Sequence, residues 1–262
     1  MEPFQAVVLG VLQGLTEFLP VSSSGHLVLG QQFFGLTEPE LLFNISLHIG
    51  TLMAVLIVFS RQIAAILSAL WRLPRLRADA GGWQALVEKN EPVRTVLLIV
   101  VGSVPTVLIG VGLHRAADRI FASVPLVGVM LLVTGGLLWS TRGRNAGSRP
   151  MAAMTVKDAL LIGLMQGLAI LPGVSRSGAT ISAALLLGVE QSTAGRFSFL
   201  LSIPAIAGAL LLEIRSGVTS SASAPLLLAG GAAAAVTGWL ALIALLRVVN
   251  SGHLHRFAPY CW

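Results

Sequence analysis

Long apolar runs alternate with short polar stretches along this chain, and five of the runs are long enough to cross a bilayer. A helix needs about 20 residues to cross the hydrocarbon core. The runs lie at about residues 41–60, 95–113, 124–140, 197–214 and 225–249. This pattern predicts an all-α polytopic membrane protein with about five full transmembrane helices.

Two further apolar stretches are interrupted by proline, glycine and serine, and they repeat one another. Residues 10–26 and residues 163–179 coincide at eight of seventeen positions, with a constant offset of 153. The similarity continues into FNISLHI (43–49) and FSFLLSI (197–203). Two half-length runs around a polar break are typical of a re-entrant hairpin, in which protein or a watery cavity satisfies the broken backbone.

The composition is that of a protein surrounded mainly by lipid. Hydrophobic residues make up 55% of the chain and charged residues only 11%, against about 25% charged residues in a soluble domain. Glu2 stands where a secretory signal would be basic, so the N-terminus is interpreted as mature. The single cysteine, Cys261, excludes an internal disulfide framework and a thiolate zinc site.

The net charge of +6 is better explained by membrane topology than by nucleic-acid binding. Basic residues gather in the connections 61–94 and 141–157, which the positive-inside rule places in the cytoplasm. The connection 114–123 is then outside, despite Arg115 and Arg119. Counting spans from these connections makes the first hairpin enter from outside and the second from the cytoplasm. Such an inverted repeat has its site near the bilayer midplane.

The chain is therefore expected to form a single integral membrane domain over residues 1–262. The first half of the repeat covers about 1–140 and the second about 158–262. Three full spans fall in the first half and two in the second. We therefore expect a sixth span to be missing from this chain.

A carboxylate within the first repeated stretch is the strongest candidate for function. Glu17 lies inside an apolar run, and ionisable residues at membrane depth are functional by default. Gln13 lies one helical turn earlier, so the two side chains could present oxygen ligands to a hard cation such as Mg²⁺ or Ca²⁺. His48, on an apolar helix face, is instead expected to be a hydrogen-bonded packing residue.

The polar break of the first hairpin supplies hydroxyls and an imidazole. It consists of Ser22, Ser23, Ser24, Gly25 and His26. Small residues let backbone N–H groups face an anion at a helix N-terminus. Ser23 is a candidate nucleophile and His26 a candidate general base or acid.

The second hairpin supplies a cation where the first has Ser23. Arg176 lies in PGVSRSGAT between two apolar runs, and its planar guanidinium suits phosphate oxygens. Small and hydroxyl-bearing residues surround it, and the candidates for phosphate binding are Gly173, Ser175, Ser177 and Thr180.

An acid with an oxygen-ligand neighbour, an imidazole, hydroxyls and an arginine are suited to phosphoryl transfer. A site inside lipid indicates a lipid-borne phosphate as substrate. The rival hypothesis is a secondary transporter or lipid flippase, because inverted repeats with broken helices also build transporters.

The residues QGLTEFLPVSSSGH and LPGVSRSGAT closely resemble the two signature motifs of the bacterial undecaprenyl-diphosphate phosphatase family, also called the bacitracin-resistance protein family. The resemblance includes FNISLHIGTLMAV and RFSFLLSIPAIAG and runs through nearly the whole chain. The first motif has Glu or Gln, three residues, then Glu, and here these are Gln13 and Glu17. The resemblance places the catalytic serine and histidine on Ser23 and His26, and the essential arginine on Arg176. It places the serines and threonine of the second motif on Ser175, Ser177 and Thr180.

The resemblance implies hydrolysis of undecaprenyl diphosphate to the monophosphate and inorganic phosphate, which recycles the lipid carrier for cell-wall synthesis and counters bacitracin. It also implies a divalent cation, the bacterial plasma membrane and a site open to its outer face. The expected partners are the polyprenyl diphosphate substrate and membrane lipids, with no nucleic acid, and a homodimer is left open. Three routes stay open for the chemistry: attack by Ser23 with His26 as base, attack by His26, or attack by water.

Overall fold

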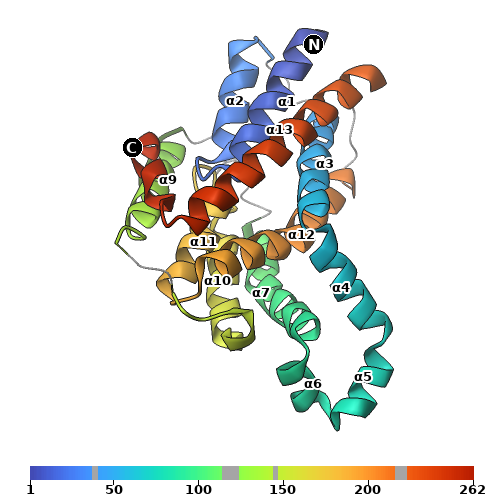
Figure 1. Ribbon diagram of the computed structural model, residues 1–262. Coiled ribbons are helices and arrows are strands. Elements are labelled where there is room, and N and C mark those ends of the chain that lie inside the picture. Colours follow the sequence, from blue (N-terminus) through green and yellow to red (C-terminus); the bar gives the residue numbers. More distant parts are fainter. Residues whose placement is uncertain (37–40, 114–123, 144–146, 216–222) are drawn as a thin grey trace.

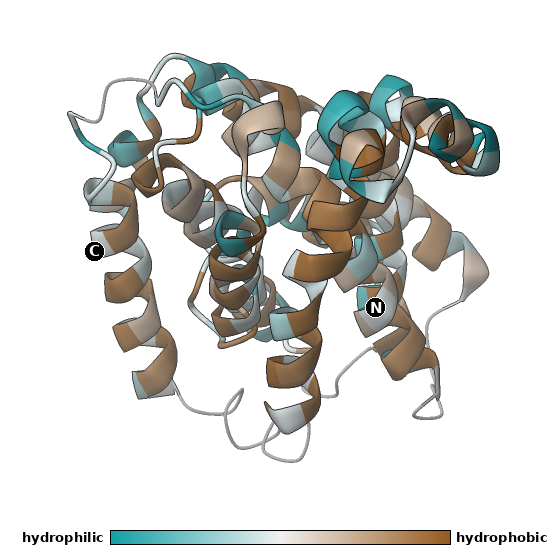
Figure 2. Ribbon diagram, turned by 90° about the horizontal axis from the view of Figure 1, so that it is seen from below, coloured by the Kyte–Doolittle hydropathy of each residue, from teal (hydrophilic) through white to brown (hydrophobic). Residues whose placement is uncertain are grey.

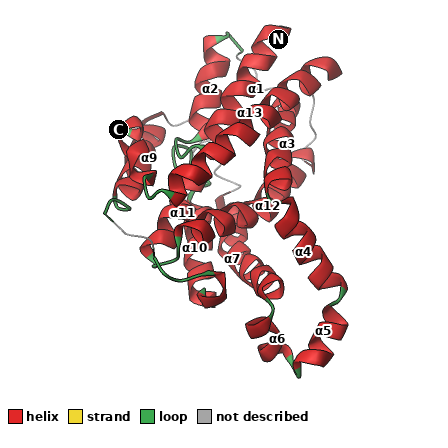
Figure 3. Cartoon of the chain, viewed as in Figure 1, coloured by secondary structure: helices red, strands yellow, loops and turns green. Residues whose placement is uncertain are grey.

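The computed structural model describes residues 1–36, 41–113, 124–143, 147–215 and 223–262. This part of the chain is helical, with a single isolated β-bridge between Arg149 and Val189 and no β-strand (Figure 3). The helices, labelled in Figure 1, are α1 (Pro3–Phe18), α2 (Ser23–Phe33), α3 (Leu41–Val58), α4 (Ser60–Trp71), α5 (Leu73–Ala80), α6 (Trp83–Lys89), α7 (Glu91–Leu113), α9 (Val124–Trp139), α10 (Val156–Leu168), α11 (Arg176–Leu186), α12 (Gln191–Arg215), α13 (Ala224–Asn250) and α14 (Ala258–Cys261). Short 3₁₀ helices cover Met151–Ala153 and Leu254–Phe257.

Four of the described helices, α3, α7, α12 and α13, are long and apolar enough to cross a membrane. They confirm four of the five expected spans. The fifth coincides with α9, whose 16 residues are fewer than the roughly 20 of a full span. Figure 2 shows that apolar residues dominate the long helices. The protein is thus a multi-pass membrane protein.

The connection 61–94 is largely helical, which the hydropathy pattern did not predict. It contains α4, α5 and α6, which form an arm projecting from the bundle (Figure 1). Its charged residues lower the hydropathy without removing helix propensity, so a hydropathy reading misses these helices. The guanidinium of Arg77 stacks over the Trp83 ring, 4.7 Å from its centroid. The connection 114–123 with Arg115 and Arg119, which was expected outside, is not among the described residues.

Small residues allow the helices of the bundle to approach closely. α1 packs along α13, and α10 packs along α7. A Cβ on Gly14 would lie 2.7 Å from the carbonyl oxygen of Ala234 in α13. A Cβ on Gly163 would overlap the Gly102 carbonyl in α7. Close packing through glycine and alanine is typical of helices in lipid, where van der Waals contact drives association.

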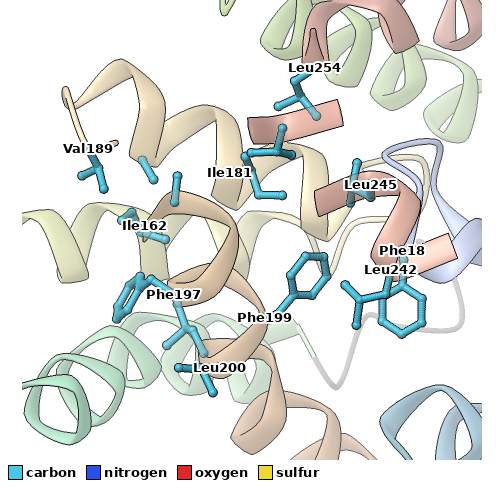
Figure 4. Close-up of a cluster of buried hydrophobic side chains, with 14 of the residues drawn as sticks. Phe18, Ile162, Ile181, Val189, Phe197, Phe199, Leu200, Leu242, Leu245 and Leu254 are labelled. Carbon is cyan, nitrogen blue, oxygen red and sulfur yellow. The ribbon is translucent and has the colours of Figure 1, made fainter. Parts of the chain in front are cut away.

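The end of α1 is anchored in the largest hydrophobic core, which Figure 4 shows. Phe18 of α1, Phe199 of α12 and Leu242 of α13 are all fully buried there. The rings of Phe18 and Phe199 meet edge to face, with centroids 5.8 Å apart. Because Phe18 directly follows Glu17, this packing fixes the position of the candidate carboxylate.

Arg149 contacts both the beginning of α10 and the end of α11. It forms an ion pair with Asp158 in the first turn of α10 and donates to the Leu187 carbonyl, 3.0 Å away, just after α11. Asp158 also completes a capping box with Thr155. Arg149, read from sequence only as a topological charge, therefore also positions the second repeated stretch.

The non-helical break between α1 and α2, which form the first helix pair, is shorter than the sequence suggested. α1 ends at Phe18 and α2 begins at Ser23. Of the five residues assigned to the break, only Ser22 precedes the helix, and Ser23 through His26 form the first turn of α2. The correction has a physical reason: once φ turns positive at Ser22 (67°), the chain re-enters the helical region immediately. Ser23 and His26 therefore lie one turn apart on a helix rather than on a loop.

Candidate active site

Glu17 is the centre of a hydrogen-bonded cluster that joins the two repeated stretches. Its side chain is only 8% exposed. Its Oε1 lies 2.6 Å from the NH2 nitrogen of Arg176, 159 positions away in the chain. Its Oε2 accepts from Ser23 Oγ at 2.8 Å and from Gln13 Nε2 at 3.0 Å. The structure thus brings together Gln13, Glu17, Ser23 and Arg176, four of the residues that the sequence singled out.

The ion pair is buried on both sides, because the side chain of Arg176 is also only 15% exposed. Removing one partner of a buried pair costs about 3–5 kcal/mol, since the other charge is left uncompensated. The guanidinium carries five N–H donors, and one terminal nitrogen serves Glu17. The remaining face of Arg176 is suited to bind phosphate oxygens while the carboxylate holds it in place.

The break between α1 and α2 contacts the break between α10 and α11 directly. Ser22 Oγ accepts from the Gly173 N–H at 3.2 Å. Ser177 Oγ donates to the Phe18 carbonyl at 2.8 Å. A Cβ on Gly178 would lie 3.2 Å from Pro20 Cβ. The site therefore forms where the helix pairs meet, and neither pair holds it alone.

The first turn of α11 is held by its own hydroxyls. Ser175 Oγ accepts from the Gly178 N–H at 3.2 Å and lies 3.2 Å from Ser177 Oγ. Thr180 Oγ1 donates to the Arg176 carbonyl at 2.8 Å. All three hydroxyls are engaged with protein, so in this conformation they support the backbone that carries Arg176.

The remaining small residues of the first pair lie beside these contacts. Ser24 Oγ is 3.3 Å from Ser22 Oγ. A Cβ on Gly25 would make an ordinary van der Waals contact with Val127 Cγ1, 3.7 Å away, so this position could hold a small side chain. Among the described residues, Ser22 is the one non-glycine residue with positive φ. Such strain is often stored at functional sites.

Both ring nitrogens of His26 are engaged, and neither of these partners is Ser23. Nδ1 lies 2.9 Å from the Ser22 carbonyl oxygen, and Nε2 lies 2.8 Å from the hydroxyl of Tyr260. The oxygen that accepts from Ser23 belongs to Glu17. In this conformation the group placed to take the proton of Ser23 is therefore the carboxylate.

The chain is similar to known proteins along nearly its whole length. The family model described as bacitracin resistance protein BacA matches residues 6–262. The chain belongs to this family. Undecaprenyl-diphosphatases of three organisms align with all of the chain. That of Desulforapulum autotrophicum is 51% identical over 263 residues and 95% of its own length. Those of Desulfosudis oleivorans and Carboxydothermus hydrogenoformans are 52% and 42% identical, over 96% and 94% of their lengths.

The BacA match begins within α1 and extends past α11, so it contains every residue of the candidate site. It agrees with the resemblance drawn from the two motifs. It also agrees with the membrane character shown by the four long apolar helices.

Thr134 of α9 is a site residue that sequence reasoning missed in this BacA-family protein. Its buried hydroxyl donates to the Gly173 carbonyl at 2.9 Å and accepts from the Ser175 N–H at 3.1 Å. It thereby holds both sides of the turn before Arg176. A hydroxyl inside an apolar span was the available signal, by the same reasoning that singled out Glu17.

His48 of α3 is hydrogen-bonded within its own helix, which agrees with the packing role that the sequence favoured. Its Nδ1 lies 2.8 Å from the Asn44 carbonyl oxygen, one turn earlier.

Proposed function

We propose that this chain hydrolyses undecaprenyl diphosphate to undecaprenyl phosphate and inorganic phosphate. The full-length relatives bear the name of that activity. The observation that carries the proposal is the contact between Glu17 and Arg176, one charge from each broken helix pair, inside a protein with 55% hydrophobic residues. An acid–guanidinium pair at this depth suits a phosphate carried on a lipid. Transport, the rival hypothesis, is not favoured by the names of these relatives.

In the proposed reaction, Arg176 binds the terminal phosphate and Ser23 is the attacking group that the contacts favour. Ser23 Oγ forms a bond to the terminal phosphorus, and its proton passes to Glu17 Oε2, 2.8 Å away. The bond from that phosphorus to the bridging oxygen breaks, and undecaprenyl phosphate leaves. Water then hydrolyses the phosphoserine and releases inorganic phosphate. Attack by His26 or by water remains the alternative.

A divalent cation, Mg²⁺ or Ca²⁺, is proposed to bind beside Glu17. Gln13 is fully buried, and its Oε1 has no hydrogen-bond partner. This oxygen and the Glu17 carboxylate form a small donor set, and among the described residues no cluster of three or more His, Cys, Asp and Glu adds to it. Mg²⁺ commonly uses one or two carboxylates and completes its shell with water and substrate phosphates. When bound, the cation would offset the charge of the diphosphate.

We also propose that α1–α2 and α10–α11 are re-entrant hairpins of an inverted repeat. The four helices have 16, 11, 13 and 11 residues, too few for full spans. The packing is exchanged between halves: α1 of the first half lies on α13 of the second, and α10 of the second lies on α7 of the first. Such an exchange is expected of two halves related by a pseudo-twofold axis. The site would then face the outer side of the bacterial plasma membrane.

The proposed activity is tested by phosphate release in detergent. We expect the purified chain with Mg²⁺ to release phosphate from farnesyl diphosphate, and chelation by EDTA to stop it. A flippase moves its lipid between leaflets without breaking the diphosphate bond, so absence of phosphate release would contradict hydrolysis. Trapping radiolabelled phosphate on the protein and testing its acid stability separates the routes. Phosphoserine survives acid, phosphohistidine does not, and no trapped label indicates water.

A further inference from the structure

His26 is held at both ring nitrogens by groups from different parts of the chain. The Ser22 carbonyl can only accept, so Nδ1 carries the hydrogen in that contact. In the neutral imidazole, Nε2 is then an acceptor, and the Tyr260 hydroxyl donates to it at 2.8 Å. The tautomer of His26 is thus fixed by its neighbours.

The contact with Tyr260 bridges 234 positions and is supported on several sides. The rings of Tyr260 and His26 stack, with centroids 5.8 Å apart and an interplanar angle of 15°. The next residue, Cys261, is buried and donates to the Pro20 carbonyl at 3.4 Å. Trp262 packs on Trp139 of α9, with centroids 5.6 Å apart. These anchors on either side of the site hold the phenol against the imidazole.

We propose that Tyr260 is a positioning residue for His26 in the phosphatase reaction. A phenol hydroxyl can donate to a neutral Nε2 and can accept from a protonated one. It therefore keeps the ring in one orientation whether or not His26 has taken up a proton. The second-half counterpart of His26 is Ala179, so this arrangement belongs to the first pair alone. The inference rests on the proposed hydrolysis, because it concerns the rate of that reaction.

The test is a double-mutant cycle of Tyr260→Phe and His26→Gln, with phosphate release measured with enzyme in excess so that slow variants still give a rate. Tyr260→Phe keeps the stacked ring and removes only the hydroxyl. We expect it to lower the single-turnover rate constant at saturation about fivefold, the effect of one hydrogen bond, with little change in the enzyme concentration that gives half of that rate. In the His26→Gln background we expect the same change to have less than about a twofold effect, since coupled residues are non-additive.

Cys261→Ser is the matched control, because it changes the neighbouring residue but keeps a donor for the Pro20 carbonyl and leaves the phenol in place. We expect it to keep nearly the full rate. The chain has one tyrosine, so the tyrosine Raman doublet reports this hydroxyl alone and should change in His26→Gln.

The inference is overturned by equal rate losses in both backgrounds, by no loss in Tyr260→Phe, by an unchanged Raman doublet, or by a loss in Cys261→Ser equal to that in Tyr260→Phe. An inactive wild-type chain would instead contradict the proposed hydrolysis, so the two failures are distinguishable.

Discussion

Gln13 and Gln166 occupy matching positions in the two helix pairs, and both are buried with Oε1 unpaired. Gln13 Nε2 donates to Glu17 at 3.0 Å. Gln166 Nε2 donates to Thr106 Oγ1 at 3.2 Å, and the counterpart of Glu17 is Ile170. The same glutamine thus serves a carboxylate in one pair and helix packing in the other. The unpaired glutamine oxygen is proposed to bind a cation only in the first helix pair, where a carboxylate lies beside it.

The two serines that precede α2 and α11 differ in the same way. Ser175 has φ of −75° and caps its own helix through the Gly178 N–H. Ser22 has φ of 67°, does not cap α2, and uses its Oγ to bind Gly173 of the other pair. The first turn of α11 is therefore closed by its own side chain, whereas that of α2 has N–H groups without a side-chain cap. Uncapped helix N-termini are suited to anions.

Among the changes that test the difference between the two helix pairs, replacing Arg176 by lysine is expected to lower activity most. Lysine keeps the charge that faces Glu17 but loses the planar fork that binds two phosphate oxygens. We expect kcat to fall about 10²- to 10³-fold, as for loss of one donor to a charge in the transition state. Phosphate release measures it, and a thermal unfolding midpoint close to wild type shows that the ion pair still forms. Near-normal turnover would show that the charge alone suffices.

The sequence predicted the contents of the site better than its contacts. The repeat located Glu17, Ser23 and Arg176, because charges and hydroxyls inside apolar runs are few and conspicuous. It did not reveal that Ser23 donates to Glu17, because the two lie on different helices and their approach depends on the angle of the break.

Two omissions of the sequence analysis, one in the fold and one in the site, share one cause. The helices of 61–94 were missed, and Thr134 was passed over inside an apolar span. Hydropathy averages a window of residues, so it neither detects a charged helix nor registers a single hydroxyl. The re-entrant course of the two helix pairs stays a prediction.

Alanine at the two glutamines is expected to have a moderate effect that separates their roles. Gln13→Ala removes a proposed cation ligand, and we expect the Mg²⁺ concentration for half-maximal activity to rise about tenfold, as when a supporting metal contact is lost. Gln166→Ala removes the bond to Thr106 and should lower the unfolding midpoint, leaving the Mg²⁺ requirement unchanged. Titrating both variants with Mg²⁺ tests this, and equal shifts would show that the glutamines act alike.

The smallest expected effect concerns the two serines, and it tests whether they really differ. Ser175→Ala should lower the free energy of unfolding by about 1 kcal/mol, because an N-cap is lost. Ser175→Thr should recover most of this loss, since threonine also caps helices. Ser22→Thr should give no such recovery relative to Ser22→Ala, because a β-branched residue is strongly disfavoured at positive φ. Thermal unfolding of the four variants in one detergent measures the contrast. If threonine stabilises both positions equally, Ser22 is a conventional cap in solution, and the first turn of α2 is closed in the same way as that of α11.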